Sequence, residues 1–129
     1  MSRRKKVLIV EDEALAALAL RGQLEIWGYE VCGPAVSGEE SVGRAVTEQP
    51  DVILMDVKLK GRMDGIEAAR EILSRFEVPI IFISGYSGNE IRKRAGMDSP
   101  HEFMSKPLDY GLLEEKLVAV CAKKNRGWS

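Results

Sequence analysis

Short apolar runs alternate along this chain with longer segments whose apolar residues recur at helical spacing. Several of the runs are nearly unbroken, as in Lys6-Val-Leu-Ile-Val10, which is typical of a strand buried on both faces of a sheet. We predict five strands on this basis, at residues 6–10, 30–35, 52–55, 79–83 and 102–105.

Each predicted strand is followed by a predicted helix. The first helix ends near Gly28, and the fifth runs from about 109 to 124. Between them, a Ser or Asp with a Glu three residues later indicates a capping box at the start of each helix. These pairs are Ser37 with Glu40, Asp64 with Glu67, and Ser87 with Glu90.

Apolar spacing indicates which side of each helix faces inward. The fourth helix has little stripe beyond Ile91 and Ala95, so we expect it to be the least firmly packed. We interpret the cations at 92–94 as a solvated face of it. The inward residues predicted for the other helices are Leu20, Leu24 and Trp27, then Val42, Ala45 and Val46, then Ile66, Ala69, Leu73 and Phe76, then Leu113, Leu117 and Val120.

Five strand–helix alternations without a linker or repeat predict one α/β domain over 1–129, with a core of about 5–124. Strand–helix–strand crossovers are right-handed and produce a parallel sheet covered on both faces. We therefore expect a single doubly wound (βα)5 domain.

Composition narrows the classes of function. The 129 residues are 45% hydrophobic and 30% charged with a net charge of −1, so nothing steers the chain toward nucleic acid or anionic lipid. It contains no apolar run of membrane-spanning length and no signal-peptide core. Cys32 and Cys121 lie far apart in apolar segments, as expected of reduced thiols. We predict a cytoplasmic protein that binds neither nucleic acid nor membrane directly.

Polar residues collect where the predicted strands end. Glu11 and Asp12 follow the first strand, and Asp56 ends the third. Carboxyl ends of parallel strands share one edge, so the three carboxylates come together if the strand order is 2-1-3-4-5, which makes the first and third strands neighbours. Crowded carboxylates either raise a pKa or bind a cation, and oxygen ligands without His or Cys favour Mg²⁺, with Mn²⁺ as an alternative.

Two more side chains complete this cluster. Ser84 ends the fourth strand, and Lys106 follows the fifth. A carboxylate nucleophile, a divalent ion, an ammonium and a hydroxyl around one volume are the parts needed to form and hold an acyl phosphate. Each of these residues alone could belong to an exposed turn or cap a helix. The full set, with each member at the end of its strand, favours a phosphorylation site at Asp56.

The chain resembles a response-regulator receiver domain of two-component signalling along essentially its whole length. The motifs that carry the resemblance are Val10-Glu11-Asp12, Leu54-Met55-Asp56, Met63-Asp64-Gly65, Ile83-Ser84-Gly85 and Ser105-Lys106-Pro107. The resemblance implies an α/β fold of the flavodoxin-like kind, with a five-stranded parallel sheet in the order 2-1-3-4-5. It implies that Asp56 is the phosphoacceptor. It also implies that Asp12 binds Mg²⁺ directly, Glu11 through water, and Lys58 through its backbone carbonyl.

Further roles follow from the same resemblance. Ser84 matches the switch Ser/Thr, Gly85 the small residue after it, and Phe103 the switch aromatic. Lys106 and Ser84, with Gly85, would stabilise the phosphoryl group. The bond before Pro107 resembles the family's frequent cis peptide, which would direct Lys106 into the site.

Some positions depart from the common pattern. The loop from Val57 to Met63 is one residue longer than in many members and lacks their usual proline. Phe82-Ile-Ser-Gly-Tyr86 resembles a receiver subgroup known mainly from alphaproteobacterial stress signalling. Lys58 and Tyr86 occupy positions that modulate phosphoryl lifetime in the family.

The implied function is a switch rather than a metabolic enzyme, with chemistry limited to phosphorylation and autodephosphorylation of Asp56. Its partners would be a histidine kinase or histidine phosphotransfer protein and a downstream protein or linked output domain. The fourth helix, fifth strand and fifth helix would form the switched surface and a potential dimer interface. We expect a stand-alone regulator or phosphorelay shuttle before an excised receiver.

Two other classes of function share part of this pattern. A haloacid-dehalogenase-type phosphohydrolase also uses a strand-end Asp, but it needs a second Asp two residues later, where this chain has Lys58. A degenerate receiver that only binds a partner would not need the complete acidic, Ser and Lys set.

Overall fold

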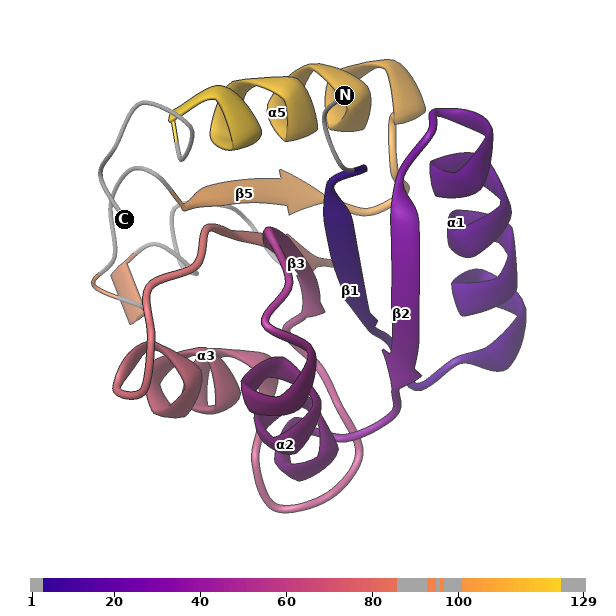
Figure 1. Cartoon of the computed structure of the whole chain (residues 1–129). Coiled ribbons are helices and arrows are strands. Elements are labelled where there is room, and N and C mark those ends of the chain that lie inside the picture. The colour runs from indigo at the N-terminus through magenta and orange to yellow at the C-terminus, as the bar shows by residue number, and fades with distance from the viewer. Residues whose placement is uncertain (1–3, 86–92, 95, 97–100, 124–129) are drawn as a thin grey trace.

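The computed structural model describes residues 4–85, 93–94, 96 and 101–123. Five parallel strands form one sheet in the order β2-β1-β3-β4-β5, which confirms the predicted topology (Figure 1). The fourth strand starts one residue later than predicted. The strands are β1 (Lys6–Val10), β2 (Glu30–Ala35), β3 (Val52–Asp56), β4 (Ile80–Ser84) and β5 (Glu102–Ser105).

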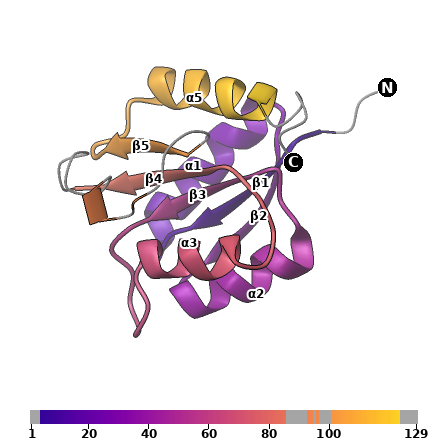
Figure 2. The same ribbon diagram turned by 90° about the vertical axis from the view of Figure 1, so that its left-hand side faces the viewer.

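Helices cover both faces of the sheet. Figures 1 and 2 show α1 and α5 on one face and α2 and α3 on the other. The predicted fourth helix falls mainly outside the described residues; Lys93 and Arg94 are described, and both are helical. The labelled helices are α1 (Ala14–Ile26), α2 (Gly38–Glu48), α3 (Gly65–Leu73) and α5 (Tyr110–Lys123).

Two apolar cores lie between these layers. Every residue of β3 and β4 is buried, which explains their nearly unbroken apolar sequences. Phe82 contributes to the core under α2 and α3, and Leu54 to the core under α1 and α5. Burying one large apolar side chain contributes about 1.5–3 kcal/mol, so these layers hold the carboxyl ends of the strands in fixed register.

The predicted inward face of α2 was wrong at Val46, whose side chain is 39% exposed. The buried stripe runs instead through Gly38, Ser41 and Ala45. Ser41 can lie inside because its hydroxyl donates to the Gly38 carbonyl at 2.6 Å, so its polar atom has a partner. The buried face of α2 therefore includes a serine, which the spacing of apolar residues does not identify, and it excludes Val46.

Both described caps begin as predicted, with one difference. The Ser37 hydroxyl accepts from the Glu40 N–H at 3.1 Å, but the Glu40 carboxylate accepts from Val36 rather than from Ser37. Asp64 and Glu67 form a complete capping box at the start of α3. A cap of this kind is worth about 1 kcal/mol and fixes where each helix starts.

The edge strand β2 is irregular. Its register against β1 shifts between Leu8 and Val10, beside Gly33, which has a φ of +94°. A Cβ at Gly33 would lie 2.6 Å from the Ile9 carbonyl oxygen, so only glycine fits there. The Gly33–Pro34 peptide bond is cis.

Both cysteines are free thiols, as the sequence predicted. Among the residues that the structure describes, no helix combines the length and the apolar character needed to cross a membrane.

Candidate phosphorylation site

Three carboxylates meet at the carboxyl edge of the sheet. One oxygen from each of Glu11, Asp12 and Asp56 lies within 4.8 Å of the other two. Each carboxylate accepts one backbone N–H, from Glu13 to Glu11 and from Lys58 to Asp56, both at 3.1 Å. Asp12 accepts from Lys60, also at 3.1 Å. These bonds hold the carboxylates in place, and an all-oxygen donor set suits a hard cation such as Mg²⁺.

Glu11 is the member of this cluster whose pKa is most clearly perturbed. Burial, together with the charge of Asp56, raises the pKa of Glu11 to about 7. Its backbone bond to Glu13 and the charge of Lys106 oppose that rise. Glu11 therefore titrates near neutral pH, where a bound cation would compete with its proton.

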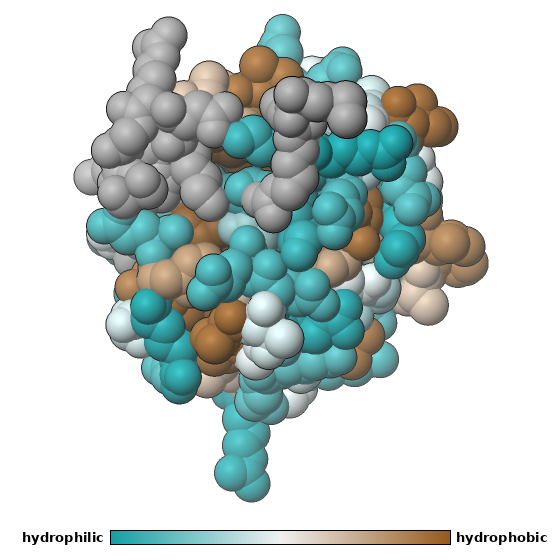
Figure 3. All heavy atoms as spheres, viewed as in Figure 1, coloured by the Kyte–Doolittle hydropathy of each residue, from teal (hydrophilic) through white to brown (hydrophobic). Residues whose placement is uncertain are grey.

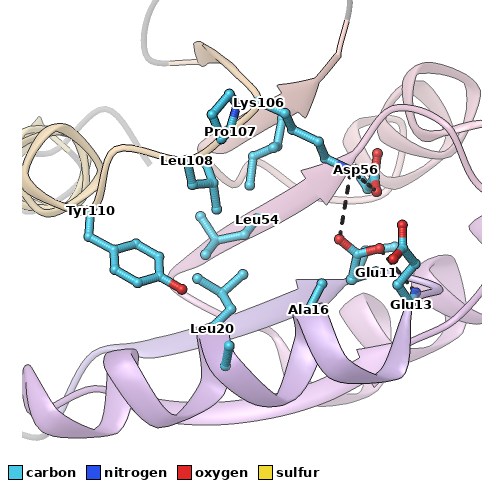
Figure 4. Close-up of a pocket in the computed structure, with 13 residues that line it drawn as sticks. Glu11, Glu13, Ala16, Leu20, Leu54, Asp56, Lys106, Pro107, Leu108 and Tyr110 are labelled. Carbon is cyan, nitrogen blue, oxygen red and sulfur yellow. Dashed lines mark hydrogen bonds and ion pairs between the residues drawn. The ribbon is translucent and has the colours of Figure 1, made fainter.

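Lys106 reaches this cluster from the loop after β5. Its ammonium lies 2.9 Å from Asp56 Oδ2 and 4.0 Å from Glu11 Oε1 (Figure 4). Burial alone would lower the pKa of Lys106, but its hydrogen bond to Asp56 and the nearby negative charges raise it. The backbone N–H of Lys106 donates to the Ser84 carbonyl at 2.8 Å, and the Lys106–Pro107 peptide bond is cis.

The two expected switch residues lie on adjacent strands. Ser84 ends β4, beside Ser105 of β5, and its side chain is buried. Phe103 is buried in β5 and stacks on Phe82, with ring centroids 5.2 Å apart. Gly85, directly after Ser84, is exposed at the same edge.

Of the two expected lifetime modulators, only Lys58 can be placed. Its side chain is exposed, and it lines a hollow beside Asp12 and Asp56. Tyr86 lies outside the described residues, as does the capping pair Ser87 and Glu90 of the fourth helix.

An apolar cavity beside the site was not predicted from the sequence. It has a volume of about 510 Å³ and lies between α1 and the start of α5 (Figure 4). Small side chains of α1, Ala16 and Ala19, leave this space open above Leu54. Glu11, Asp56 and Lys106 line its other end.

The outer face of α1 is also apolar. Leu15 is 81% exposed, Leu18 66% and Ile26 79%. Figure 3 shows apolar residues along the right-hand edge, where α1 runs in Figure 1. The signal was present in the sequence, since Leu15, Leu18 and Ile26 share a helical face opposite Leu20 and Leu24.

Comparison with known proteins agrees with this geometry. The transcriptional regulatory protein PdtaR of Mycobacterium tuberculosis is 40% identical over 103 residues, which are 80% of this chain and 50% of that protein. The chain thus spans about half the length of the curated relatives it matches.

Two solved structures are similar over nearly the whole chain. The signal receiver domain of a modulated diguanylate cyclase from Desulfovibrio desulfuricans has a TM-score of 0.85 and 38% identity, covering 95% of this chain and 98% of that one. The receiver domain of sensor histidine kinase PA1611 from Pseudomonas aeruginosa has a TM-score of 0.81 and 28% identity, covering 93% and 99%. That structure has a magnesium ion coordinated in its active-site cleft.

The family model of the response regulator receiver domain matches residues 7–118, a span that contains all three carboxylates, Ser84 and Lys106. The chain belongs to the response regulator receiver domain family.

Proposed function

We propose that Asp56 accepts a phosphoryl group from a phosphohistidine of a partner protein and thereby changes the surface that a downstream protein recognises. One observation carries the proposal. Asp56 is buried at the end of β3, 2.9 Å from the Lys106 ammonium, and is grouped with two further carboxylates.

Each neighbour has a task in this transfer. A carboxylate oxygen of Asp56 forms the new bond to phosphorus, while the bond from phosphorus to the donor imidazole nitrogen breaks and that nitrogen keeps the electron pair. Lys106, already charged and in contact with Asp56, neutralises phosphoryl oxygens as charge accumulates on them. Ser84 donates a hydrogen bond to the product.

Glu11, Asp12, Asp56 and the backbone carbonyl of Lys58 would hold Mg²⁺, or Mn²⁺ in its place. The bound ion would supply positive charge to the phosphoryl oxygens and relieve the repulsion among the carboxylates. Glu11 must lose its proton for this, because its raised pKa leaves it partly protonated near neutral pH.

The signal would leave the site through β4 and β5. Ser84 would move toward the phosphoryl group, and Phe103 would turn from its stack on Phe82 into the space that Ser84 leaves. The surface formed by the fourth helix, β5 and α5 would then change, and a dimer could form there. Only a phosphoryl group that binds the two conformations with different affinity can drive this shift.

The apolar residues beside the site favour a protein, rather than a small molecule, as the phosphoryl donor. A donor that brings its histidine to Asp56 would pass over the apolar cavity and the exposed Leu15 and Leu18 of α1. Burying these side chains would contribute affinity that a small phosphate ester cannot gain.

The acceptor is tested by Asp56→Asn, with radiolabelled phosphoryl transfer from a panel of phosphorylated histidine kinases and phosphotransfer proteins, with and without Mg²⁺. Labelling should require Mg²⁺ and Asp56. Asp51→Asn is the matched control: Asp51 is also buried and lies just before the other end of β3, and this variant should be labelled normally. Full labelling of Asp56→Asn would refute the proposal, and steady turnover of a small phosphate ester would favour a hydrolase instead.

The readout is tested by Ser84→Ala. Labelling should persist, while the dependence of partner binding on phosphorylation should weaken. Partner binding that keeps its full dependence would exclude the route through Ser84 and Phe103.

A further inference from the structure

The loop that follows β3, residues 57–63, is tied to the acidic cluster through its backbone. The backbone N–H of Lys60 donates to Asp12 Oδ2 at 3.1 Å. The two residues are 48 positions apart in sequence, so this contact depends on the path that the loop takes past the carboxyl end of β1. The loop contains no proline, so each of its residues has a backbone N–H to donate.

The start of α2 fixes the path of this loop at two places. Ser37, the N-cap residue of α2, forms an isolated parallel β-bridge with Lys60. Gly38, the next residue, packs directly on the end of the loop. A Cβ at Gly38 would lie 2.6 Å from the Met63 carbonyl oxygen, so the two backbones are in close contact. The loop therefore lies against α2 both at Lys60 and at Met63.

Asp12 differs from the other two carboxylates in what holds it. Glu11 and Asp56 each accept a backbone N–H from the residue two positions later, so their bonds are local. The bond to Asp12 comes from a distant loop, so it forms only in the folded chain. One N–H takes one of about four acceptor positions on a carboxylate, so Asp12 can accept it and still bind a cation.

We propose that Lys60 is a positioning residue of the cation site. Its backbone N–H, placed by the packing of the loop on α2, keeps the carboxylate of Asp12 grouped with those of Glu11 and Asp56. The inference rests on the Mg²⁺ site of the proposed function. Asp12 is only partly buried, so without this bond its side chain can rotate toward water and away from the cluster.

The expected direction follows from how metal sites are organised. Groups that hydrogen-bond to metal-ligating carboxylates orient the ligands, and their loss lowers metal affinity by about 10–100-fold. The bond from Lys60 to Asp12 is exposed to solvent, so we expect the lower end of this range.

The first test is calorimetric titration of Mg²⁺ into two variants at one position. Lys60→Pro removes the backbone N–H, whereas Lys60→Ala, the matched control, keeps it and removes only the side chain. Lys60→Ala should bind Mg²⁺ at least as tightly as the wild type, and Lys60→Pro about tenfold more weakly than Lys60→Ala. Equal affinities of the two variants would overturn the role of the N–H. Tighter binding by Lys60→Pro would overturn it too, because the N–H would then compete with the cation.

The second test is amide hydrogen exchange by NMR without Mg²⁺. The Lys60 amide should be protected in the wild type and should lose this protection in Asp12→Ala. Exchange that is fast in the wild type, or unchanged in Asp12→Ala, would overturn the proposal. The Lys58 amide, which donates to Asp56, should stay protected in Lys60→Pro. Its loss there would assign the effect of proline to distortion of the whole loop, which also overturns the role of Lys60.

The contribution of α2 is tested by Gly38→Ala, with Gly43→Ala of the same helix as the matched control. The added methyl group at Gly38 should push the loop away from α2, so the Lys60 amide should lose protection and Mg²⁺ should bind more weakly. A Cβ at Gly43 would meet nothing within 4 Å, so both properties should stay unchanged. An unchanged Lys60 amide in Gly38→Ala would overturn the dependence on α2.

Failure of the positioning role and failure of the proposed function give different results. A wild type that binds Mg²⁺, together with a Lys60→Pro variant of the same affinity, would overturn the positioning role alone. A wild type that binds no Mg²⁺ would overturn the proposed cation site and the role of Lys60 together.

Discussion

Gly65 is the position where a single methyl group should do most damage to the site. A Cβ there would lie 2.2 Å from the Asp56 carbonyl oxygen and 2.8 Å from the Val57 Cα. Both are backbone atoms in or beside a fully buried strand, so neither can rotate away as a flexible side chain would. Gly65→Ala must therefore push α3 away from β3 or shift the backbone of the phosphoacceptor.

We expect this overpacking to lower the free energy of unfolding by about 1–3 kcal/mol, despite the better helix propensity of alanine. Because the displaced backbone belongs to Asp56, Mg²⁺-dependent labelling should fall more than the loss of folded protein explains. Urea denaturation and labelling under conditions where the variant is folded measure the two effects separately.

The chain offers a matched control in Gly43 of α2. A Cβ at Gly43 would meet nothing within 4 Å, so Gly43→Ala should raise the free energy of unfolding by about 0.5–1 kcal/mol and leave labelling unchanged. If Gly65→Ala were as stable and as readily labelled as Gly43→Ala, the close packing of α3 on Asp56 would not control the site.

Three further outcomes follow from the charges. Because the pKa of Glu11 is about 7 and Mg²⁺ competes with its proton, Mg²⁺ should bind about tenfold more weakly at pH 6 than at pH 8. The Glu11→Gln variant should bind Mg²⁺ weakly and with little pH dependence. Calorimetry that shows no pH dependence for the wild type would contradict this. Lys106→Met removes the cation 2.9 Å from Asp56, so Mg²⁺ should bind about two- to fivefold more tightly while phosphoryl labelling falls. The Lys106→Arg variant should retain near-normal Mg²⁺ affinity. Unchanged Mg²⁺ affinity in Lys106→Met would show that the charge of Lys106 is screened from the metal site. The His101 Nδ1 accepts from the Ile80 N–H at 3.1 Å, and burial lowers the pKa of His101, so the unfolded chain takes up a proton before the folded chain does. Neutral His101 therefore stabilises the fold above about pH 6.5, and this contribution is lost as pH falls. A wild type no more acid-sensitive than His101→Asn in thermal unfolding would disprove this.

The fold could be predicted because its signals are local and repeated. The apolar runs around Val52 and Ile81 identify buried strands, and the alternation with helices leaves few topologies. The site followed from topology rather than from contacts, since parallel strands bring Glu11, Asp56 and Lys106 to one edge whatever their separation in sequence.

Three features could not be predicted from the sequence, because they depend on the three-dimensional surroundings of the residue. Val46 lies at the border of the α2 stripe and is exposed, because the buried stripe is centred on Gly38, the hydrogen-bonded Ser41 and Ala45. The raised pKa of Glu11 requires its actual burial and its distance from Asp56, which spacing does not provide. Arg94 lies in a segment with weak helical signal, and its ion-pair partner, Asp64, is 30 residues away.

The two edge strands of the sheet, β2 and β5, limit how another protein can bind this receiver. A regular, long edge strand invites another chain to add a strand by backbone hydrogen bonding. Here β2 carries a proline and a shift of register, and β5 is only four residues long. Both borders are therefore poor templates for β-augmentation and for edge-to-edge aggregation. Recognition is left to helix surfaces and strand-end loops, which can change position without breaking the sheet.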